Sequence, residues 1–270
     1  MASGLRQRVV TALLLAGLVV AVLLWMPPVA AVAVVFVVML AGAWEWAGFA
    51  GLTSAPQRLG YLLAVACAIV AAWRATTEPA GLVRFLQVAA VWWIVGLLWL
   101  VIASQRGGRV AAACVGFAVL VPAAIGFGRL ALLEPRGQLL LLFLLVLVAA
   151  ADVGAYFGGR SLGRHKLAPR VSPGKTWEGF AAGMLGAAVA AVAGAALFER
   201  PVLPWLGVCV LVALVSVVGD LVESMFKRRA GLKDSGALLP GHGGVLDRID
   251  SLSAAAPTFL LGLLMLGAAA

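Results

Sequence analysis

Most of this chain consists of apolar runs that are long enough to cross a lipid bilayer. A spanning helix needs about 20 mostly apolar residues, because the hydrocarbon core of a bilayer is about 30 Å thick. Runs of this kind cover residues 9–26, 29–49, 59–73, 85–104, 110–133, 138–157, 177–198, 203–223 and 252–269. The third run is short and is expected to extend toward its N-terminal end. We therefore predict an all-α integral membrane protein with about nine transmembrane helices.

The composition excludes a soluble domain of this length. Only 11% of the 270 residues are charged, 64% are hydrophobic, and the mean hydropathy is +1.09. A soluble domain has about a quarter of its residues charged, so the outer surface of this chain must face lipid. The excess of 20 Lys and Arg over 11 Asp and Glu is typical of the positive-inside bias and of attraction to anionic headgroups. No nucleic-acid partner is expected.

The distribution of the basic residues predicts a cytoplasmic N-terminus. In that orientation fifteen of the 20 basic residues face the cytoplasm and five face outward, whereas the opposite orientation would invert this bias. The cytoplasmic fifteen are Arg6, Arg8, Arg58, Arg106, Arg109, Arg160, Arg164, Lys166, Arg170, Lys175, Lys227, Arg228, Arg229, Lys233 and Arg248. Arg6 and Arg8 before the first run also fit a signal peptide, but that run is long for one, so we favour a retained helix.

The residues capable of chemistry are concentrated in the second half. We divide the chain into N-terminal helices at 1–137 and a catalytic region at 138–270, with cytoplasmic loops at 158–176 and 224–250. In the first half, Glu45 is the acid at a membrane boundary, flanked by two tryptophans. An interfacial carboxylate near a helix end is the simpler interpretation of Glu45.

Three acids lie at the cytoplasmic ends of apolar runs: Asp152, Asp220 and Glu223. Ionisable groups at membrane depth are costly, and they usually face the bundle interior as ion pairs or functional groups. Asp152 alone would fit an ion pair with a nearby arginine equally well. Asp220, Glu223, Ser224 and Lys227 have the i, i+3, i+4, i+7 spacing of one helical stripe. Carboxylates and an amine at one place suit a divalent cation bound together with a polyphosphate.

The polar loop that follows contains four glycines around His242. Glycine lets backbone N–H groups approach an anion closely, since no Cβ intervenes. Asp247 and Asp250 are hard oxygen ligands of the kind that Mg²⁺ takes when it also binds substrate phosphates. A lone histidine is more often structural, but this setting favours a functional role for His242.

The loop at 158–178 is rich in basic residues, and it contains Gly174-Lys175-Thr176, which imitates the end of a P-loop. Position 169 is proline where the first glycine of that motif is required, and no strand is expected before it, so we reject a Walker A motif. The basic residues alone could reflect the positive-inside bias. Lys175, Trp177 and Glu178 at a helix entry make binding of a lipid phosphate at least as good an interpretation.

The polar loops resemble a known family. Between positions 224 and 250 the chain has Ser224, Phe226, Lys227-Arg228, Lys233-Asp234, Gly236, Leu239-Pro240, His242-Gly243-Gly244-Val245 and Asp247-Arg248-Ile249-Asp250. This pattern resembles the C-terminal signature of the phosphatidate cytidylyltransferases, also called CDP-diacylglycerol synthases. The stretches 152–156 and 172–179 resemble the same family, although Gly174 stands where the family often has lysine. The resemblance is specific from about 150 to 250.

The resemblance implies transfer of a cytidylyl group from CTP to phosphatidate, which gives CDP-diacylglycerol and diphosphate. It implies Mg²⁺ held by Asp220 and Asp247, with or without a second cation, and a homodimer in the inner (plasma) membrane whose site faces the cytoplasm. The candidate catalytic residues are Asp152, Lys227, Arg228, Lys233, His242 and Asp247. The candidate substrate-binding residues are Ser172, Lys175, Thr176, Glu178, Ser224, Lys227, Arg228, Lys233, Gly243, Gly244 and Arg248.

The residues agree with this chemistry. Both substrates are anions that repel each other in a low-dielectric interface, and metal and cationic side chains would neutralise that charge and align the attack. The phosphate monoester is already largely ionised near neutral pH, so no strong general base is needed. Lys227, Arg228 and Lys233 follow the acidic stripe and are expected to contact CTP. Lys175 lies at headgroup depth and is expected to contact phosphatidate.

Two other classes fit less well. A transporter would have acids near the bilayer midplane, whereas here they cluster at one face beside a glycine-rich loop. A CTP-dependent kinase of a membrane isoprenoid alcohol shares the nucleotide and the metal, but it needs a base for a neutral hydroxyl, for which His242 or Asp152 could serve. A CDP-alcohol phosphotransferase is excluded because its DGxxAR pattern is absent.

Overall fold

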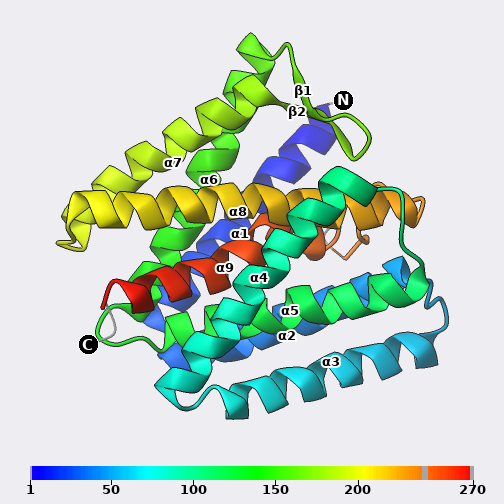
Figure 1. Ribbon diagram of the computed structural model, residues 1–270, viewed down its shortest axis with the longest axis horizontal. Coiled ribbons are helices and arrows are strands. Elements are labelled where there is room, and N and C mark those ends of the chain that lie inside the picture. The colour runs from blue at the N-terminus through cyan, green and yellow to red at the C-terminus, as the bar shows by residue number, and fades with distance from the viewer. Residues whose placement is uncertain (1, 239–242, 268–270) are drawn as a thin grey trace. The chain divides into compact units, whose positions relative to one another are not determined.

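The computed structural model describes residues 2–238 and 243–267, and within them it contains nine helices and one short β-hairpin (Figure 1). The helices are α1 (Ala2–Trp25), α2 (Pro28–Phe49), α3 (Ala55–Ala75), α4 (Pro79–Ala103), α5 (Arg109–Ala131), α6 (Gly137–Leu162), α7 (Trp177–Leu197), α8 (Val202–Arg229) and α9 (Leu246–Met265). The strands are β1 (Lys166–Ala168) and β2 (Ser172–Thr176).

The protein is an all-α membrane protein apart from this hairpin. Seven of the helices in the described residues, α2 to α8, are long and apolar enough to cross a bilayer. Helices suit that setting because they satisfy all their backbone hydrogen bonds internally. Many large apolar side chains on them are exposed, such as Val88, Ile94 and Ile102 on α4, which is the pattern of a lipid-facing surface. Spans formed by α1 and α9 remain predictions.

The observed helices follow the predicted apolar runs, but several extend well beyond them, and three of these extensions reach the polar motifs. α6 continues to Leu162, α8 continues to Arg229, and α9 begins at Leu246. The last turn of α8 contains Lys227, Arg228 and Arg229. Lysine and arginine form helices well, and cations near a helix C-terminus interact favourably with its dipole. Parts of the functional motifs therefore lie on helix ends, where loops were expected.

The chain forms two compact units, each built from three separate stretches. The first unit comprises Met1–Ala75, Gly107–Leu142 and Phe226–Ile249, and the second comprises Thr76–Arg106, Phe143–Met225 and Asp250–Ala270. The predicted division at 137/138 separates the part of the chain without recognised motifs from the part that contains them. The two compact units instead group residues that contact one another in space, so the two divisions describe different properties.

The first unit is centred on α2, α3 and α5, which pack against one another (Figure 1). Trp46 donates its indole N–H to the carbonyl of Ala112 at 2.8 Å, and the hydroxyl of Tyr61 donates to the carbonyl of Ala113 at 2.8 Å. A Cβ at Gly116 would lie 2.6 Å from the Trp46 ring. Glycine at this position therefore lets the two aromatic side chains bond the backbone of α5, which fixes the C-terminal part of α2.

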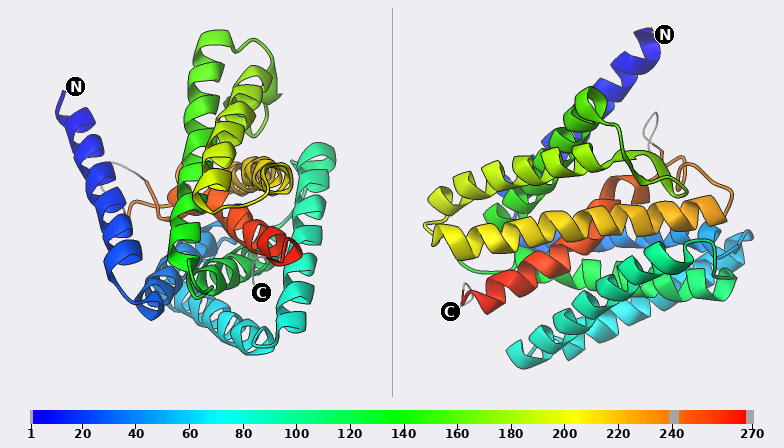
Figure 2. Two further views of the ribbon diagram at one scale, coloured as in Figure 1. Left: turned by 90° about the vertical axis from the view of Figure 1, so that its left-hand side faces the viewer. Right: turned by 45° about the horizontal axis from the view of Figure 1, so that its top comes forward.

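In the second unit α6 and α7 run side by side with unusually close backbones (Figure 2). A Cβ at Gly154 would lie 2.7 Å from the carbonyl oxygen of Ala182, and one at Gly183 would lie 2.8 Å from that of Ala151. Small residues at membrane helix interfaces permit this approach. Below the contact, Phe143, Trp205 and Phe259 form a buried aromatic cluster with centroid separations of 5.3 to 6.0 Å.

Candidate active site

The hairpin β1–β2 connects α6 to α7 in the second unit. Its strands are antiparallel, and Lys166 pairs with Thr176. Thr176 then caps α7 by accepting a hydrogen bond from the Gly179 amide at 3.1 Å. The expectation that no strand precedes Gly174 was wrong, because strands of three and five residues with Pro173 inside give little signal. Gly174-Lys175-Thr176 lies within β2, which agrees with the rejection of a Walker A motif.

Glu178 in the first turn of α7 holds the start of the hairpin. Its carboxylate accepts hydrogen bonds from the backbone amides of Arg164 at 3.1 Å and His165 at 3.2 Å. It also lies 2.6 Å from Nδ1 of His165. This residue was predicted to bind substrate. That role stays a prediction, and the observed contacts give Glu178 a local role in shaping the loop.

Two carboxylates and an ammonium group meet beside the hairpin. The Lys175 ammonium contacts an Asp220 carboxylate oxygen at 2.6 Å, and Ser224 donates to the other oxygen at 3.2 Å. Asp152 on α6 interacts electrostatically with both Asp220 and Lys175. The structure therefore brings together four residues that the sequence had placed in three separate motifs, because the hairpin folds back toward α8.

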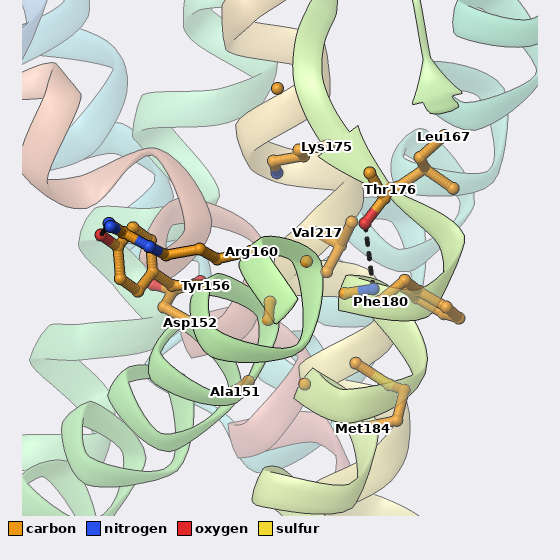
Figure 3. Close-up of a pocket in the computed structure, with 15 residues that line it drawn as sticks. Ala151, Asp152, Tyr156, Arg160, Leu167, Lys175, Thr176, Phe180, Met184 and Val217 are labelled. Atoms are coloured by element: carbon orange, nitrogen blue, oxygen red, sulfur yellow. Dashed lines mark hydrogen bonds between the residues drawn. The ribbon is translucent and has the colours of Figure 1, made fainter. Parts of the chain in front are cut away.

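A pocket of about 470 Å³ opens at this cluster (Figure 3). Its polar wall carries Asp152 and Arg160 from α6 and Lys175 from β2. Its apolar wall carries Met184 from α7 and Val217 from α8, among others. Arg160 donates to the Tyr156 hydroxyl at 2.8 Å. A cavity with an apolar side and a cationic rim suits a ligand that is itself amphipathic.

The first unit holds a second charged cluster, at the start of α9. Lys227 contacts Asp247 at 2.6 Å, and their side chains are only 9% and 8% exposed. The other Asp247 oxygen accepts hydrogen bonds from the amides of Ser235 and Gly244, each at 2.9 Å. Burial raises the pKa of the Asp247 carboxyl, but the hydrogen bonds from Lys227 and the two amides outweigh burial and hold that pKa below its ordinary value. Asp247 is therefore ionised at neutral pH.

Glu45 belongs to this second cluster, contrary to the interpretation as a simple interfacial acid. It is only 4% exposed. Its carboxylate accepts hydrogen bonds from the Ser235 hydroxyl at 2.8 Å and from the amides of Val245 and Leu246 at 3.0 and 2.9 Å. The available sequence signal was an acid between two tryptophans in an apolar run, but its partners lie about 200 residues away and leave no local pattern.

The other predicted residues lie nearer the surface. Arg228 is exposed and donates to the carbonyl of Leu232 at 3.3 Å, and Lys233 and Arg248 are exposed. Ser172 is half-buried in β2. Gly243 has a φ of +79°, a conformation that favours glycine. His242 lies outside the described residues, so its predicted role is not addressed by the structure.

The two aspartates predicted to bind metal, Asp220 and Asp247, lie in separate charged clusters. Within residues 2–238 and 243–267, no three His, Cys, Asp or Glu side chains gather as a metal site. Asp220 and Asp247 belong to different units, and each already takes a lysine ammonium at 2.6 Å. Each carboxylate therefore already binds a positively charged group, and carboxylate oxygens are the ligands that Mg²⁺ prefers. The two aspartates thus have the right ligand atoms for Mg²⁺, and Mg²⁺ binding itself stays a prediction.

Comparison with known proteins gives the family directly. A family model described as the cytidylyltransferase family matches residues 6–266. The chain belongs to the cytidylyltransferase family. This confirms the family resemblance seen in the motifs and makes the protein a nucleotidyltransferase.

Relatives in several bacteria are named phosphatidate cytidylyltransferase. The protein from Pseudomonas aeruginosa is 42% identical over 278 residues, which cover 94% of this chain and 95% of the relative. The protein from Haemophilus influenzae is 38% identical over 281 residues, covering 94% and 97%. The protein from Brucella suis is 53% identical over 134 residues, about half of each chain.

Proposed function

We propose that this membrane cytidylyltransferase uses CTP and phosphatidate and releases CDP-diacylglycerol and diphosphate. The observation that carries the proposal is the pocket of the second unit, which has an apolar wall beside a cationic rim at Lys175 and Arg160. A lipid phosphate has the same division into an apolar body and an anionic head. The names of the relatives support the same substrates.

The reaction needs one phosphoryl centre and two anionic reactants. A phosphate oxygen of phosphatidate attacks the α-phosphorus of CTP, a new P–O–P bond forms, and the bond to the β-phosphate breaks and releases diphosphate. Both reactants carry negative charge, so cationic side chains must offset their repulsion in a dry site. Lys175 is the proposed partner of the phosphatidate phosphate, and Lys227, with Arg228 and Lys233 beyond it, is the proposed partner of the CTP phosphates.

Mg²⁺ is proposed to be held by Asp220 and Asp247, where it would neutralise charge on the transferring phosphoryl group. In the structure the Lys175 ammonium pairs with the Asp220 carboxylate, and the Lys227 ammonium pairs with that of Asp247, each at 2.6 Å. If these carboxylates held a divalent cation, they would no longer need an ammonium counter-ion, and Lys175 and Lys227 would be available to substrate phosphates.

The proposed setting is the inner membrane, with the site facing the cytoplasm. The partition of fifteen basic residues against five supports this orientation, and CTP is a cytosolic metabolite that cannot cross a bilayer unaided. Spans by α1 and α9 and a homodimer belong to the same proposal.

The test uses purified protein in mixed micelles with CTP labelled at the α-phosphate and phosphatidate. We expect labelled CDP-diacylglycerol that depends on Mg²⁺ and is lost with Asp220→Asn. CTP labelled at the γ-phosphate, offered with an isoprenoid alcohol, is the competing arm. Label in the alcohol with none in CDP-diacylglycerol would overturn the proposal in favour of a lipid kinase.

A further inference from the structure

The polar segment before α9 is built around a carboxylate from the N-terminal half of the chain. Glu45 accepts three hydrogen bonds, from the Ser235 hydroxyl and from the amides of Val245 and Leu246, at 2.8 to 3.0 Å. An ionised carboxylate is an acceptor only, and all three partners are donors. The buried acid and the segment it holds therefore match each other in hydrogen-bonding character.

The glycines of this segment make room for Glu45. A Cβ at Gly236 would lie 2.5 Å from Oε1 of Glu45, and a Cβ at Gly244 would lie 2.6 Å from the same oxygen. The sequence pattern suggested that these glycines admit a phosphate. In the structure the anion beside them is the Glu45 carboxylate, which reaches them from α2.

Glu45 and Asp247 share the donors of this segment. The amide of Gly244 donates to Asp247, and the next two amides, of Val245 and Leu246, donate to Glu45. The Ser235 hydroxyl lies 2.8 Å from Glu45 and 3.1 Å from Asp247. One hydroxyl proton cannot satisfy both carboxylates fully, so the position of each carboxylate constrains the other.

We propose that Glu45 is a positioning residue of the cytidylyltransferase site, which fixes the orientation of Asp247 through Ser235 and the amides at 244–246. The inference rests on the proposed role of Asp247 in the reaction. Glu45 itself is 4% exposed and its oxygens are occupied by protein donors, so it acts on the reaction through Asp247 and does not contact substrate. The N-terminal half thereby contributes to the site through Asp247.

The first arm of the test is kinetic. Glu45→Gln keeps the shape of the side chain but turns an NH₂ group toward at least one backbone N–H or hydroxyl donor. Residues that orient a functional ligand typically contribute about 10- to 100-fold, so we expect kcat to fall by about that factor, with smaller changes in KM for CTP and phosphatidate. Glu78→Gln is the matched control, since Glu78 is exposed and its side chain makes no capping hydrogen bond to α4.

A double-mutant cycle asks whether Glu45 acts through the proposed route. Ser235→Ala removes the hydroxyl that both carboxylates contact. Residues of one hydrogen-bond network are non-additive, so the Glu45→Gln and Ser235→Ala double variant should lose less activity than the product of the single losses. Fully multiplicative losses would show that the two residues act independently and would overturn the proposal.

The second arm is amide hydrogen exchange, which does not depend on the reaction. With Glu45→Gln, exchange at residues 244–250 should accelerate, while α5 keeps its protection and Glu78→Gln changes neither region. Equal acceleration in α5 would mean general loss of structure, and unchanged exchange at 244–250 would mean that Glu45 holds nothing there; either result overturns the proposal. If Glu45→Gln does not accumulate, Ser235→Ala is judged by the same two regions. An inactive wild-type protein with the expected exchange would refute the proposed function but not the positioning.

Discussion

Replacing Gly154 with alanine should separate α6 from α7 and disturb the pocket that they line. The added Cβ would lie 2.7 Å from the carbonyl oxygen of Ala182, whereas ordinary van der Waals contact begins at 3.4 Å. The shortfall is therefore about 0.7 Å (3.4 minus 2.7). The opposing atoms belong to the α7 backbone and cannot rotate away, so one helix must move. Overpacking of this kind costs about 1–3 kcal/mol.

Gly207→Ala provides the matched control. Gly207 lies within α8, and a Cβ there would meet no atom within 4 Å. Both substitutions gain the same helix propensity, about 1 kcal/mol, so the difference between the two variants isolates the overpacking term. At about 2–4 °C per kcal/mol for a protein of this size, Gly154→Ala should unfold about 2 to 12 °C below Gly207→Ala in the same detergent.

Thermal unfolding followed by tryptophan fluorescence measures this difference, and the labelled-CTP assay measures its consequence. Asp152 lies two residues from Gly154 and lines the pocket, so Gly154→Ala should also lose activity while Gly207→Ala retains it. Equal midpoints and equal activities in the two variants would refute the close α6–α7 contact as the element that positions the pocket.

Three further predictions concern the charged residues and the topology. Asp247→Asn should lower kcat by about 10²–10³, measured in protein that still elutes as a folded species by size-exclusion chromatography; near-normal activity would remove Asp247 from the site. Lys227→Ala should mainly raise the KM for CTP, and Lys175→Ala should mainly raise that for phosphatidate at defined surface concentration, each by roughly 10- to 150-fold. A crossed result would show that the two basic clusters serve the opposite substrates. Cysteines at Ser161 and Ala237, both exposed, in a background without native cysteines should react with a membrane-impermeant reagent only from the cytoplasmic side, and reaction from outside would refute the orientation.

The helices could be predicted from the sequence because bilayer thickness sets their length. The apolar runs at 29–49 and 177–198 correspond to α2 and α7 within a residue or two. The ends of α6 and α8 could not be predicted in the same way, because charged residues continue a helix beyond the apolar stretch. The short hairpin was also not predicted, because its pairing depends on a chain reversal between Lys166 and Thr176.

The candidate site divides in a similar way. The acids at 152 and 220 could be identified because charge at membrane depth is costly and therefore conspicuous in a sequence. Asp247 could be identified because it follows a polar, glycine-rich loop. The contact of Lys175 with Asp220 was not foreseen, because these residues belong to different motifs, and the sequence contains no signal for which lysine meets which acid. Glu45 was interpreted as interfacial for the same reason. Spacing along the chain predicts which residues are neighbours on one helix, but it does not predict their partners on another helix.

The contact of Glu45 with Leu246 also has a consequence for how the protein is made. The two residues are 201 positions apart, and a ribosome adds about 5–20 residues per second. α2 therefore waits about 10 to 40 s before the donors for its acid have been synthesised. During that interval the acid lies in a nascent membrane helix without the amides that will surround it. Insertion of α2 must tolerate an acid at its end, and the residues that begin α9 complete, much later in synthesis, a cluster that α2 began.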